Sequence, residues 1–342
     1  MAEIKTTCPR CGQPFRCGNE QRGTTVNCPN CKSLIVFPRG SKRKLFVYAV
    51  VSGMVIFAAG VGSIWPTNFL WPDRRPIGVL FLASNYHSST TNPRGWFNDD
   101  TLDVAGPEGQ QRFRKALLDY TDRSIAILKK EGAQGVIVWD LEGEQYPHKT
   151  SYIGDPRLLS RLAPEMDPVA DEFFQRLHDA GLRVGLTVRP QQLVFGKNGQ
   201  PRQTGVLDIN QLLLNKIDYA RSRWKATLFY VDSNDGMWRP DEMWQLRCLA
   251  GQRPDILLIP EHHGLFYRAF SAPYVDLHKA GSFATPALAR KLFPNSFQVL
   301  NLGDTTNDPI AIAAAQRQGD VLLFRAWYWN SDCQLLERIE QK

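Results

Sequence analysis

The larger part of this chain has no excess of charge of either sign. Of its 342 residues, 41 are Lys or Arg and 34 are Asp or Glu, which gives the formal net charge of +7. Residues 1–44 hold nine basic and two acidic residues, so 32 of each sign remain for the rest. All of the excess basicity therefore lies at the N-terminus, and we expect no nucleic-acid partner for the part that follows.

Two phosphate-binding motifs are also absent. No turn between an expected strand and helix carries a GxGxxG or P-loop pattern, which removes the main sequence support for a nucleotide-binding fold. Cysteine is scarce after residue 44, where only Cys248 and Cys333 occur among seven in the chain. These two thiols either pair with each other or are simply buried.

Four of the early cysteines form two CxxC pairs. Sixteen residues separate the pair Cys8 and Cys11 from the pair Cys28 and Cys31, a spacing that allows four thiolates to surround one zinc ion tetrahedrally. Such a site has no open coordination position, so the zinc is predicted to be structural. It would hold together residues 1–40, which are too few for a core of their own.

Residues 6–38 resemble the short zinc ribbons at the N-termini of some bacterial membrane-anchored proteins. The resemblance implies an adaptor or regulatory role in the cytoplasm without identifying a partner. Cys17 is either a spare thiol or a substitute ligand. A redox role for the CxxC pairs is disfavoured because no βαβ pattern surrounds them.

An uncharged stretch at residues 45–65 follows four basic residues, Arg39, Lys42, Arg43 and Lys44. At about 1.5 Å per residue it spans the roughly 30 Å hydrocarbon layer of a membrane, and the basic flank predicts a cytoplasmic N-terminus. We therefore expect an uncleaved single-pass signal anchor in a bacterial inner membrane, with the later residues extracytoplasmic. A cleaved signal peptide is the alternative. Residues 66–76 contain three prolines and predict a short stiff linker.

From residue 77 to residue 342, strand and helix patterns alternate. Strands are expected at 77–83, 135–140, 183–189, 226–232, 255–260, 272–276, 297–302 and 320–326. Helices are expected at 109–131, 167–180, 208–222, 240–250, 284–291, 308–318 and 333–340. Eight strand-helix units predict an α/β fold, the (β/α)8 or TIM barrel, with an open doubly wound sheet as the alternative.

Polar and aromatic side chains follow most of these strands, where a barrel of this class builds its active site. The candidates, in chain order, are Asp140, Glu142, Arg189, Asp232, Asn234, Glu261, His262, Asp276, Asp304 and Trp327. Carboxylates interleaved with aromatic rings are typical of a sugar site, because acids cleave the acetal and flat rings pack against pyranose faces. The sequence therefore predicts a carbohydrate substrate, and no cofactor for the barrel.

Two of these acids are predicted to form the catalytic pair. Glycoside cleavage needs one carboxyl to protonate the leaving oxygen while a carboxylate attacks, or activates water, on the other face. We assign Asp232 as the nucleophile and Glu261 as the acid/base, because neighbouring barrel strands place their terminal side chains a few ångströms apart. The other candidates are assigned to substrate binding, although Asp140 and Glu142 form an alternative pair. Arg189 either holds a carboxylate ionised or only forms a salt bridge.

Four segments resemble those of poorly characterised bacterial glycoside-hydrolase barrels, and the resemblance covers about residues 77–340. They are residues 139–144 (WDLEGE), 186–191 (LTVRPQ), 231–234 (VDSN) and 260–263 (PEHH). In the α-amylase family the nucleophilic Asp, the acid Glu and a stabilising Asp follow strands four, five and seven, and Asp232, Glu261 and Asp304 occupy similar places. The chain departs from that family at Tyr230 and Gly303, where the family has Arg and His. In the α-galactosidase type the acid follows strand six, which nominates Asp276.

Three functions follow as hypotheses. The first is a membrane-anchored glycosidase that acts on an extracytoplasmic polysaccharide or oligosaccharide. The second is an inactive barrel that binds a glycan or a partner while the ribbon signals inside the cell. The third is a metal-dependent hydrolase that uses Asp232, Glu261, His262, His263 and Asp304. Against the third, the first strand is not followed by an HxH pair, and adjacent histidines on a strand point in two directions.

Overall fold

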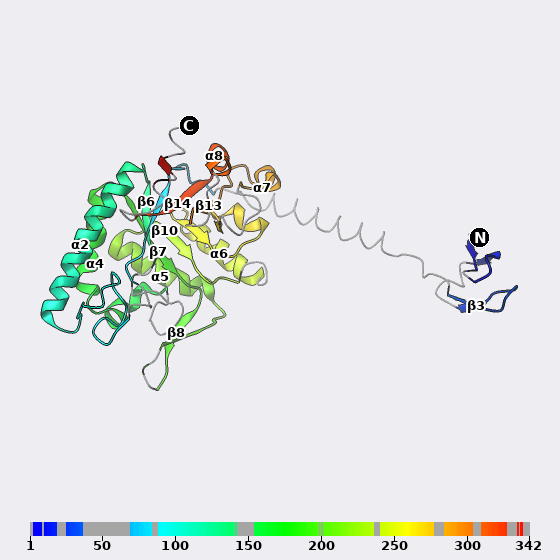
Figure 1. Ribbon diagram of the computed structural model, residues 1–342, viewed down its shortest axis with the longest axis horizontal. Helices are drawn as coiled ribbons and strands as arrows, with labels where there is room; N and C mark the ends of the chain where they lie inside the picture. The colour runs from blue at the N-terminus through cyan, green and yellow to red at the C-terminus, as the bar shows by residue number, and fades with distance from the viewer. Residues whose placement is uncertain are drawn as a thin grey trace. The chain divides into compact units, whose positions relative to one another are not determined.

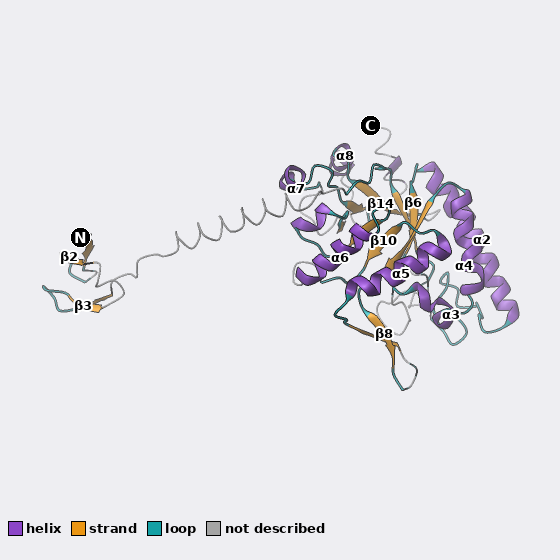
Figure 2. Ribbon diagram, turned by 180° about the vertical axis from the view of Figure 1, so that it is seen from behind, coloured by secondary structure: helices purple, strands orange, loops and turns teal. Residues whose placement is uncertain are grey.

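The computed structural model describes two compact units, Met1–Pro66 and Thr67–Lys342 (Figures 1 and 2). The described residues are 3–8, 10–18, 25–36, 69–83, 88–139, 141, 154–197, 199, 201–235, 240–276, 284–303, 309–326, 334 and 336–337. Within these ranges, no helix has the length and apolarity needed to cross a membrane. The predicted anchor at residues 45–65 lies outside the described residues, so it stays a prediction.

The N-terminal unit contains two antiparallel strand pairs. Strand β1 (Glu3–Thr7) pairs with β2 (Pro14–Gly18), and β3 (Thr25–Asn27) pairs with β4 (Leu34–Val36). Each pair is joined by a tight turn that contains one CxxC motif. The turns include a residue with positive φ, Gly12 at 73° and Lys32 at 60°.

The second unit is built on eight parallel strands, as predicted, in the order β11-β10-β7-β6-β5-β14-β13-β12. Their bounds are β5 Ile77–Leu80, β6 Gly135–Val138, β7 Arg183–Val188, β10 Leu228–Val231, β11 Leu257–Pro260, β12 Tyr274–Asp276, β13 Val299–Asn301 and β14 Val321–Arg325. The two ends of this order approach each other, because the backbone N–H of Ala272 donates to the carbonyl of Leu258 at 3.0 Å. The sheet is therefore a nearly closed barrel, which confirms the predicted (β/α)8 class and excludes the open sheet.

Helices cover the outside of this barrel (Figures 1 and 2). They are α2 Pro107–Lys130, α3 Leu159–Leu162, α4 Asp167–Asp179, α5 Ile209–Trp224, α6 Pro240–Gln252, α7 Ala287–Leu292 and α8 Pro309–Arg317, with short 3-10 helices at Pro156–Leu158 and Leu265–Ala269. Most of the predicted helix 333–340 lies outside the described residues. On α6, Cys248 is exposed and free, so it is not the buried thiol expected as one alternative.

A hairpin that the sequence did not predict follows β7. Its strands are β8 (Gln192–Phe195) and β9 (Pro201–Thr204), and they pair antiparallel. Figure 1 shows the hairpin projecting from the barrel. At its base, Leu193 packs against Leu162, so the hairpin is tied to the segment that precedes α4.

The core has two layers because successive side chains on a strand point to opposite faces. One layer fills the barrel interior and includes Val79, Ile137, Tyr230, Ile259 and Leu323. The other lies between strands and helices and takes the intervening strand positions. The first inward-facing residue beyond the buried part of each strand therefore lies at the carboxyl-end rim of the barrel.

The amino-terminal end of the barrel interior is closed by the described part of the predicted linker. Trp71 is only 7% exposed, packs with the interior residues, and donates its indole N–H to Gln134 Oε1 at 2.9 Å. Phe69 stacks on Phe297 with ring centroids 5.6 Å apart. Residues 69–76 thus form part of the barrel unit.

The long connection from β5 to α2 is fixed by a buried acid. Glu165 is 4% exposed and accepts from Arg94 Nε at 2.6 Å and from the indole N–H of Trp96 at 2.5 Å. The buried amide of Asn92 donates to the carbonyl of Trp96 at 3.1 Å. This network holds the connection against the segment before α4.

Replacing Trp71 with alanine is expected to destabilise the barrel by about 3 to 5 kcal/mol. It empties the closed end of the core and leaves Gln134 Oε1 with only the longer hydrogen bond from Arg183, at 3.4 Å. Urea denaturation of the full-length chain, followed by far-UV circular dichroism, measures this. The matched control is Leu70→Ala, because Leu70 is 65% exposed. Equal losses for the two variants would show that Trp71 does not belong to the core.

Candidate functional site

Asp232 and Glu261 occupy neighbouring inward positions at the rim. On β10, Leu228 and Tyr230 point into the barrel, and Asp232 is the next residue in that alternation. On β11, Leu257 and Ile259 point inward, and Glu261 is next. Since β10 and β11 pair in parallel with Val231 opposite Pro260, the two carboxyls meet at the carboxyl end of the barrel.

Asp232 is bound by a guanidinium from the adjacent strand end. Arg189, directly after β7, donates from Nε to Asp232 Oδ2 at 2.6 Å and also from a terminal nitrogen to the same oxygen. The side chains of Arg189 and Asp232 are 8% and 14% exposed, so the ion pair is largely withdrawn from water. Arg189 also donates to Gln203 Oε1 at 3.2 Å, which connects the β8–β9 hairpin to the rim.

A buried lysine holds the backbone around Arg189. Lys216, on α5, donates to the carbonyl of Arg189 at 2.7 Å and to that of Gln191 at 2.9 Å. Its ammonium is 3.9 Å from Asp155 Oδ2. Lys216 therefore fixes the backbone at the end of β7 from outside the barrel, while the guanidinium of Arg189 reaches the rim.

The carboxyl of Glu261 has a raised pKa. Burial is the main cause, and the negative charge of Asp232 and a side-chain hydrogen bond with it act in the same direction. The backbone N–H of Ser233, which donates to Glu261 Oε2 at 2.8 Å, opposes the shift. Ser233 has a φ of 57°, and this left-handed turn follows Asp232 directly. Glu261 therefore keeps its proton to a higher pH than an ordinary glutamate, beside an Asp232 that is paired with Arg189.

The loops after β10 and β11 are joined by one amide. Asn234 is 1% exposed; its Nδ2 donates to the carbonyl of His262 at 2.6 Å, and its Oδ1 accepts from the N–H of His262 at 2.9 Å. Both polar atoms of the amide are thus occupied by backbone groups, so the amide fixes the loops. The ring of His262 is 59% exposed, with Nε2 3.8 Å from Glu261 Oε2.

His263 has a different environment from His262. Burial, followed by the positive charge of Arg268, lowers the pKa of His263 to about 4. A hydrogen bond with the backbone of Tyr274 acts in the opposite direction. The imidazole is therefore neutral at pH 7, and the two adjacent histidines do not act as one pair.

Asp276 lies near the phenol of Tyr274, which is also close to Glu261 and Asp232. Asn301, on β13, donates from Nδ2 to Tyr274 Oη at 2.7 Å and to Asp276 Oδ1 at 3.3 Å. Burial raises the pKa of Tyr274, and the charges of Asp276, Glu261 and Asp232 raise it further. Tyr274 and Asn301 thus extend the acid pair toward β12 and β13.

Aromatic rings close the barrel beneath these acids. Trp139 stacks on Tyr230 with centroids 4.2 Å apart, and Tyr230 meets Tyr274 edge-on at 5.3 Å. Phe81 lies 5.7 Å from Trp139. Tyr230 is only 2% exposed, so among these rings only the half-buried Phe81, Trp139 and Tyr274 have surface that a ligand could contact.

The structure brings together Arg189, Asp232, Asn234, Glu261 and His262, and it places Asp276 one strand further along. Four predicted site residues lie outside the described residues: Asp140, Glu142, Asp304 and Trp327. Sequence reasoning missed Asn301 and Gln203. Asn301 was recoverable from the alternation along 297–302, whereas Gln203 belongs to the unpredicted hairpin.

The four N-terminal cysteines also come together. The thiol sulfurs of Cys8, Cys11, Cys28 and Cys31 all lie within 4.8 Å of one another, with Cys8 to Cys31 at 3.6 Å and Cys11 to Cys28 at 3.7 Å. A tetrahedral zinc with Zn–S bonds of about 2.3 Å needs sulfurs about 3.8 Å apart, so the cluster fits a metal of this kind. The hydroxyl of Ser33 lies 3.3 Å from Cys8 Sγ and is the main cause that lowers the pKa of Cys8 to about 6.

No family model and no curated protein matches this chain. Among solved structures, it is similar to a noncanonic maltogenic alpha-amylase from Thermotoga neapolitana, at 13% identity over 73% of this chain and 67% of that one, with a TM-score of 0.42. It is also similar to an alpha-L-fucosidase from Bacteroides thetaiotaomicron, at 12% identity over 81% of this chain and 73% of that one, with a TM-score of 0.42. At such values a likeness does not identify an activity, so the function has to be inferred from the rim residues.

The cysteine cluster is expected to bind one zinc ion per chain. Elemental analysis of the full-length protein checks this, and Co²⁺ in place of zinc should give thiolate charge-transfer absorption. Cys28→Ser should lose the metal, whereas Cys248→Ser, at an exposed free thiol of the other unit, should retain it. Full metal content in Cys28→Ser would contradict the assignment.

Arg189→Leu is expected to cost about 3 to 5 kcal/mol of stability, because it leaves the carboxylate of Asp232 buried without its partner. The double variant Arg189→Leu/Asp232→Asn should recover part of that loss. Urea denaturation of the full-length chain measures both, and Arg202→Leu, at an exposed position on β9, is the control. If the single variant costs no more than the control, the ion pair does not organise the rim.

Proposed function

We propose that the chain is a glycoside hydrolase whose acid pair is Asp232 and Glu261. The observation that carries the proposal is the placement of the two carboxyls on adjacent strands, one paired with Arg189 and the other with a raised pKa. Paired acids with unequal environments are what acetal cleavage requires. The half-buried ring of Trp139, which stacks on Tyr230, is the candidate surface for the apolar face of a sugar ring.

In this mechanism Glu261 is the general acid. Its carboxyl protonates the glycosidic oxygen as that bond breaks, and its raised pKa keeps the proton available at a higher pH than for an ordinary glutamate. Asp232 is the nucleophile on the opposite face of the anomeric carbon. Arg189, which is buried against Asp232, orients that carboxylate and balances its charge.

The substrate has to separate the two carboxyls. Retaining glycosidases hold their acids about 5 to 5.5 Å apart, and inverting enzymes hold them further apart. Here Glu261 and Asp232 are close enough to hydrogen-bond with each other. We propose that the sugar displaces this contact, which is possible because the side chain of Glu261 is 30% exposed.

His262 and Asp276 are the described candidates for binding substrate hydroxyls. His262 is exposed beside Glu261, and Asp276 lies at the end of β12 with Asn301 as a partner. We propose that Asp140, Glu142, Asp304 and Trp327 contribute further contacts from their loops. Asn234 supports the site indirectly, because its buried amide is bonded to the backbone of His262.

We also propose the cellular arrangement expected from the sequence: a zinc ribbon in the cytoplasm, a single membrane anchor at residues 45–65, and the barrel on the extracytoplasmic side. The basic residues before the uncharged stretch support this orientation. A polysaccharide or oligosaccharide outside the cytoplasm is then the substrate class.

A glycan-binding barrel without catalysis is the second candidate. The interaction between Asp232 and Glu261 favours it, because a substrate has to displace that interaction before the two carboxyls can act on opposite sides of a glycosidic bond. A metal-dependent hydrolase has less support. Among the described residues, the only group of three or more clustered metal-ligating side chains is the N-terminal cysteine set.

The test uses the full-length chain, screened for release of reducing ends from a panel of bacterial and plant glycans. Asp232→Asn and Glu261→Gln should each reduce the rate at least about a hundredfold, whereas the exposed acids Asp119 and Glu108, changed to Asn and Gln, should retain it. The parent rate should fall as pH rises through the raised pKa of Glu261, since the acid is then deprotonated.

Two outcomes would contradict the assignment. A parent that turns over while Glu261→Gln keeps its full rate would move the acid to another carboxyl. Glycan binding without turnover would support the inactive barrel.

A further inference from the structure

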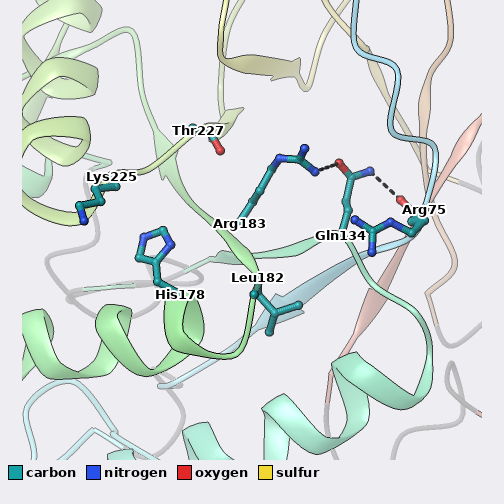
Figure 3. Close-up of a pocket in the computed structure, with 8 residues that line it drawn as sticks. Arg75, Gln134, His178, Leu182, Arg183, Lys225 and Thr227 are labelled. Atoms are coloured by element: carbon teal, nitrogen blue, oxygen red, sulfur yellow. Dashed lines mark hydrogen bonds between the residues drawn. The ribbon is translucent and has the colours of Figure 1, made fainter.

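A cavity of about 370 Å³ lies at the end of the barrel opposite the acid pair. Its lining residues stand just before or at the start of strands: Gln134 precedes β6, Arg183 begins β7 and Thr227 precedes β10. Figure 3 shows Arg183 and Gln134 joined by a hydrogen bond, with His178 and Lys225 from neighbouring segments. The proposed catalysis uses none of these residues.

The cavity has more positive than negative charge around it. Arg75 and Arg183 both bind Asp73, each at 2.7 Å from Oδ2, so one carboxylate serves two guanidinium groups. Lys225 is a third cation in the lining, and its ammonium has no hydrogen bond or ion pair within the part of the chain that the structure describes. The local balance is therefore an excess of two positive charges.

Hydrogen-bonding atoms in the lining also lack partners. Thr227 Oγ1 is buried and has no hydrogen-bond partner among the described residues. In the ring of His178, Nε2 donates to the carbonyl of Trp224 at 2.8 Å. The other nitrogen of the neutral ring, Nδ1, is then a hydrogen-bond acceptor. A buried hydroxyl without a partner is costly unless a ligand or water completes it.

We propose that this cavity binds a phosphate ester. A phosphate offers several acceptor oxygens in different directions, which suits the separate donors of Arg183, Lys225 and Thr227. The volume lies in the range of about 300 to 1,000 Å³ that small-molecule sites occupy, so the esterified group also has room. The acceptor nitrogen of His178 suits a hydroxyl on that group.

Two sources of such an ester are possible, a soluble phosphate ester or a phospholipid headgroup. The sequence favours the phospholipid headgroup, because Arg75 lies only ten residues after the end of the predicted membrane segment. Both sources present the same phosphate to the same donors. They differ in the apolar chains that a lipid adds.

The experiment titrates the full-length chain by calorimetry at low salt with three probes: glycerol 3-phosphate, dihexanoyl phosphatidylglycerol and, as a neutral control, glycerol. We expect binding of at least one phosphorylated probe with one site per chain and none of glycerol. Lys225→Gln and Thr227→Val should each weaken it at least about fivefold, since each removes one donor to the phosphate. Lys197→Gln, which makes the same charge change on the exposed β8–β9 turn, should stay within about twofold.

Tighter binding of the lipid probe would identify a headgroup, and equal or tighter binding of glycerol 3-phosphate would identify a soluble ester. Both results support the proposal. It is wrong if neither phosphorylated probe binds, or if Lys225→Gln binds as tightly as Lys197→Gln. The cavity would then be only a part of the ion-pair network that stabilises this end of the barrel.

Discussion

The ion pair between Arg189 and Asp232 connects the parts of the rim that form the proposed site. It joins the ends of β7 and β10, and through Gln203 it reaches the β8–β9 hairpin. Lys216 donates a hydrogen bond to the backbone carbonyl of Arg189 from outside the barrel, so the backbone from which the guanidinium extends is held in place. The charge of Asp232 in turn helps to raise the pKa of Glu261. The arrangement of Asp232 and Glu261 therefore depends on Arg189, which follows the neighbouring strand β7.

The two ends of the barrel have opposite chemistry. At the carboxyl end, acids and an amide surround the phenol of Tyr274, above a floor of stacked rings. At the amino end, guanidinium groups share one carboxylate beside a cavity, and Trp71 covers the core. The apolar interior between them keeps the two polar regions apart. The proposed acid site and the proposed phosphate site thus share no residue.

Much of this architecture was predictable because it follows from local patterns, apolar runs that alternate with helical segments. The eight strands were predicted from short continuous apolar runs, which are typical of parallel strands buried on both faces, and the rim position of Asp232 and Glu261 from their place directly after two such runs. The role of Asn234 did not follow, since its bonds to His262 depend on how two loops meet. Residues 69–76 were expected to form a linker from their prolines, whereas the burial of Trp71 depends on the barrel beneath it. The β8–β9 hairpin lacks a strong apolar pattern, so its strands gave no clear signal.

The claim that Asp232 and Glu261 act as one acid pair is tested most directly by the titration of Glu261 itself. Carbon-13 NMR of the glutamate carboxyls in the full-length chain gives its pKa, with Glu261→Gln to assign the resonance. We predict a pKa above the ordinary glutamate value of about 4.3, and a decrease when Asp232→Asn removes the neighbouring charge. An ordinary pKa that does not respond to Asp232→Asn would contradict the account.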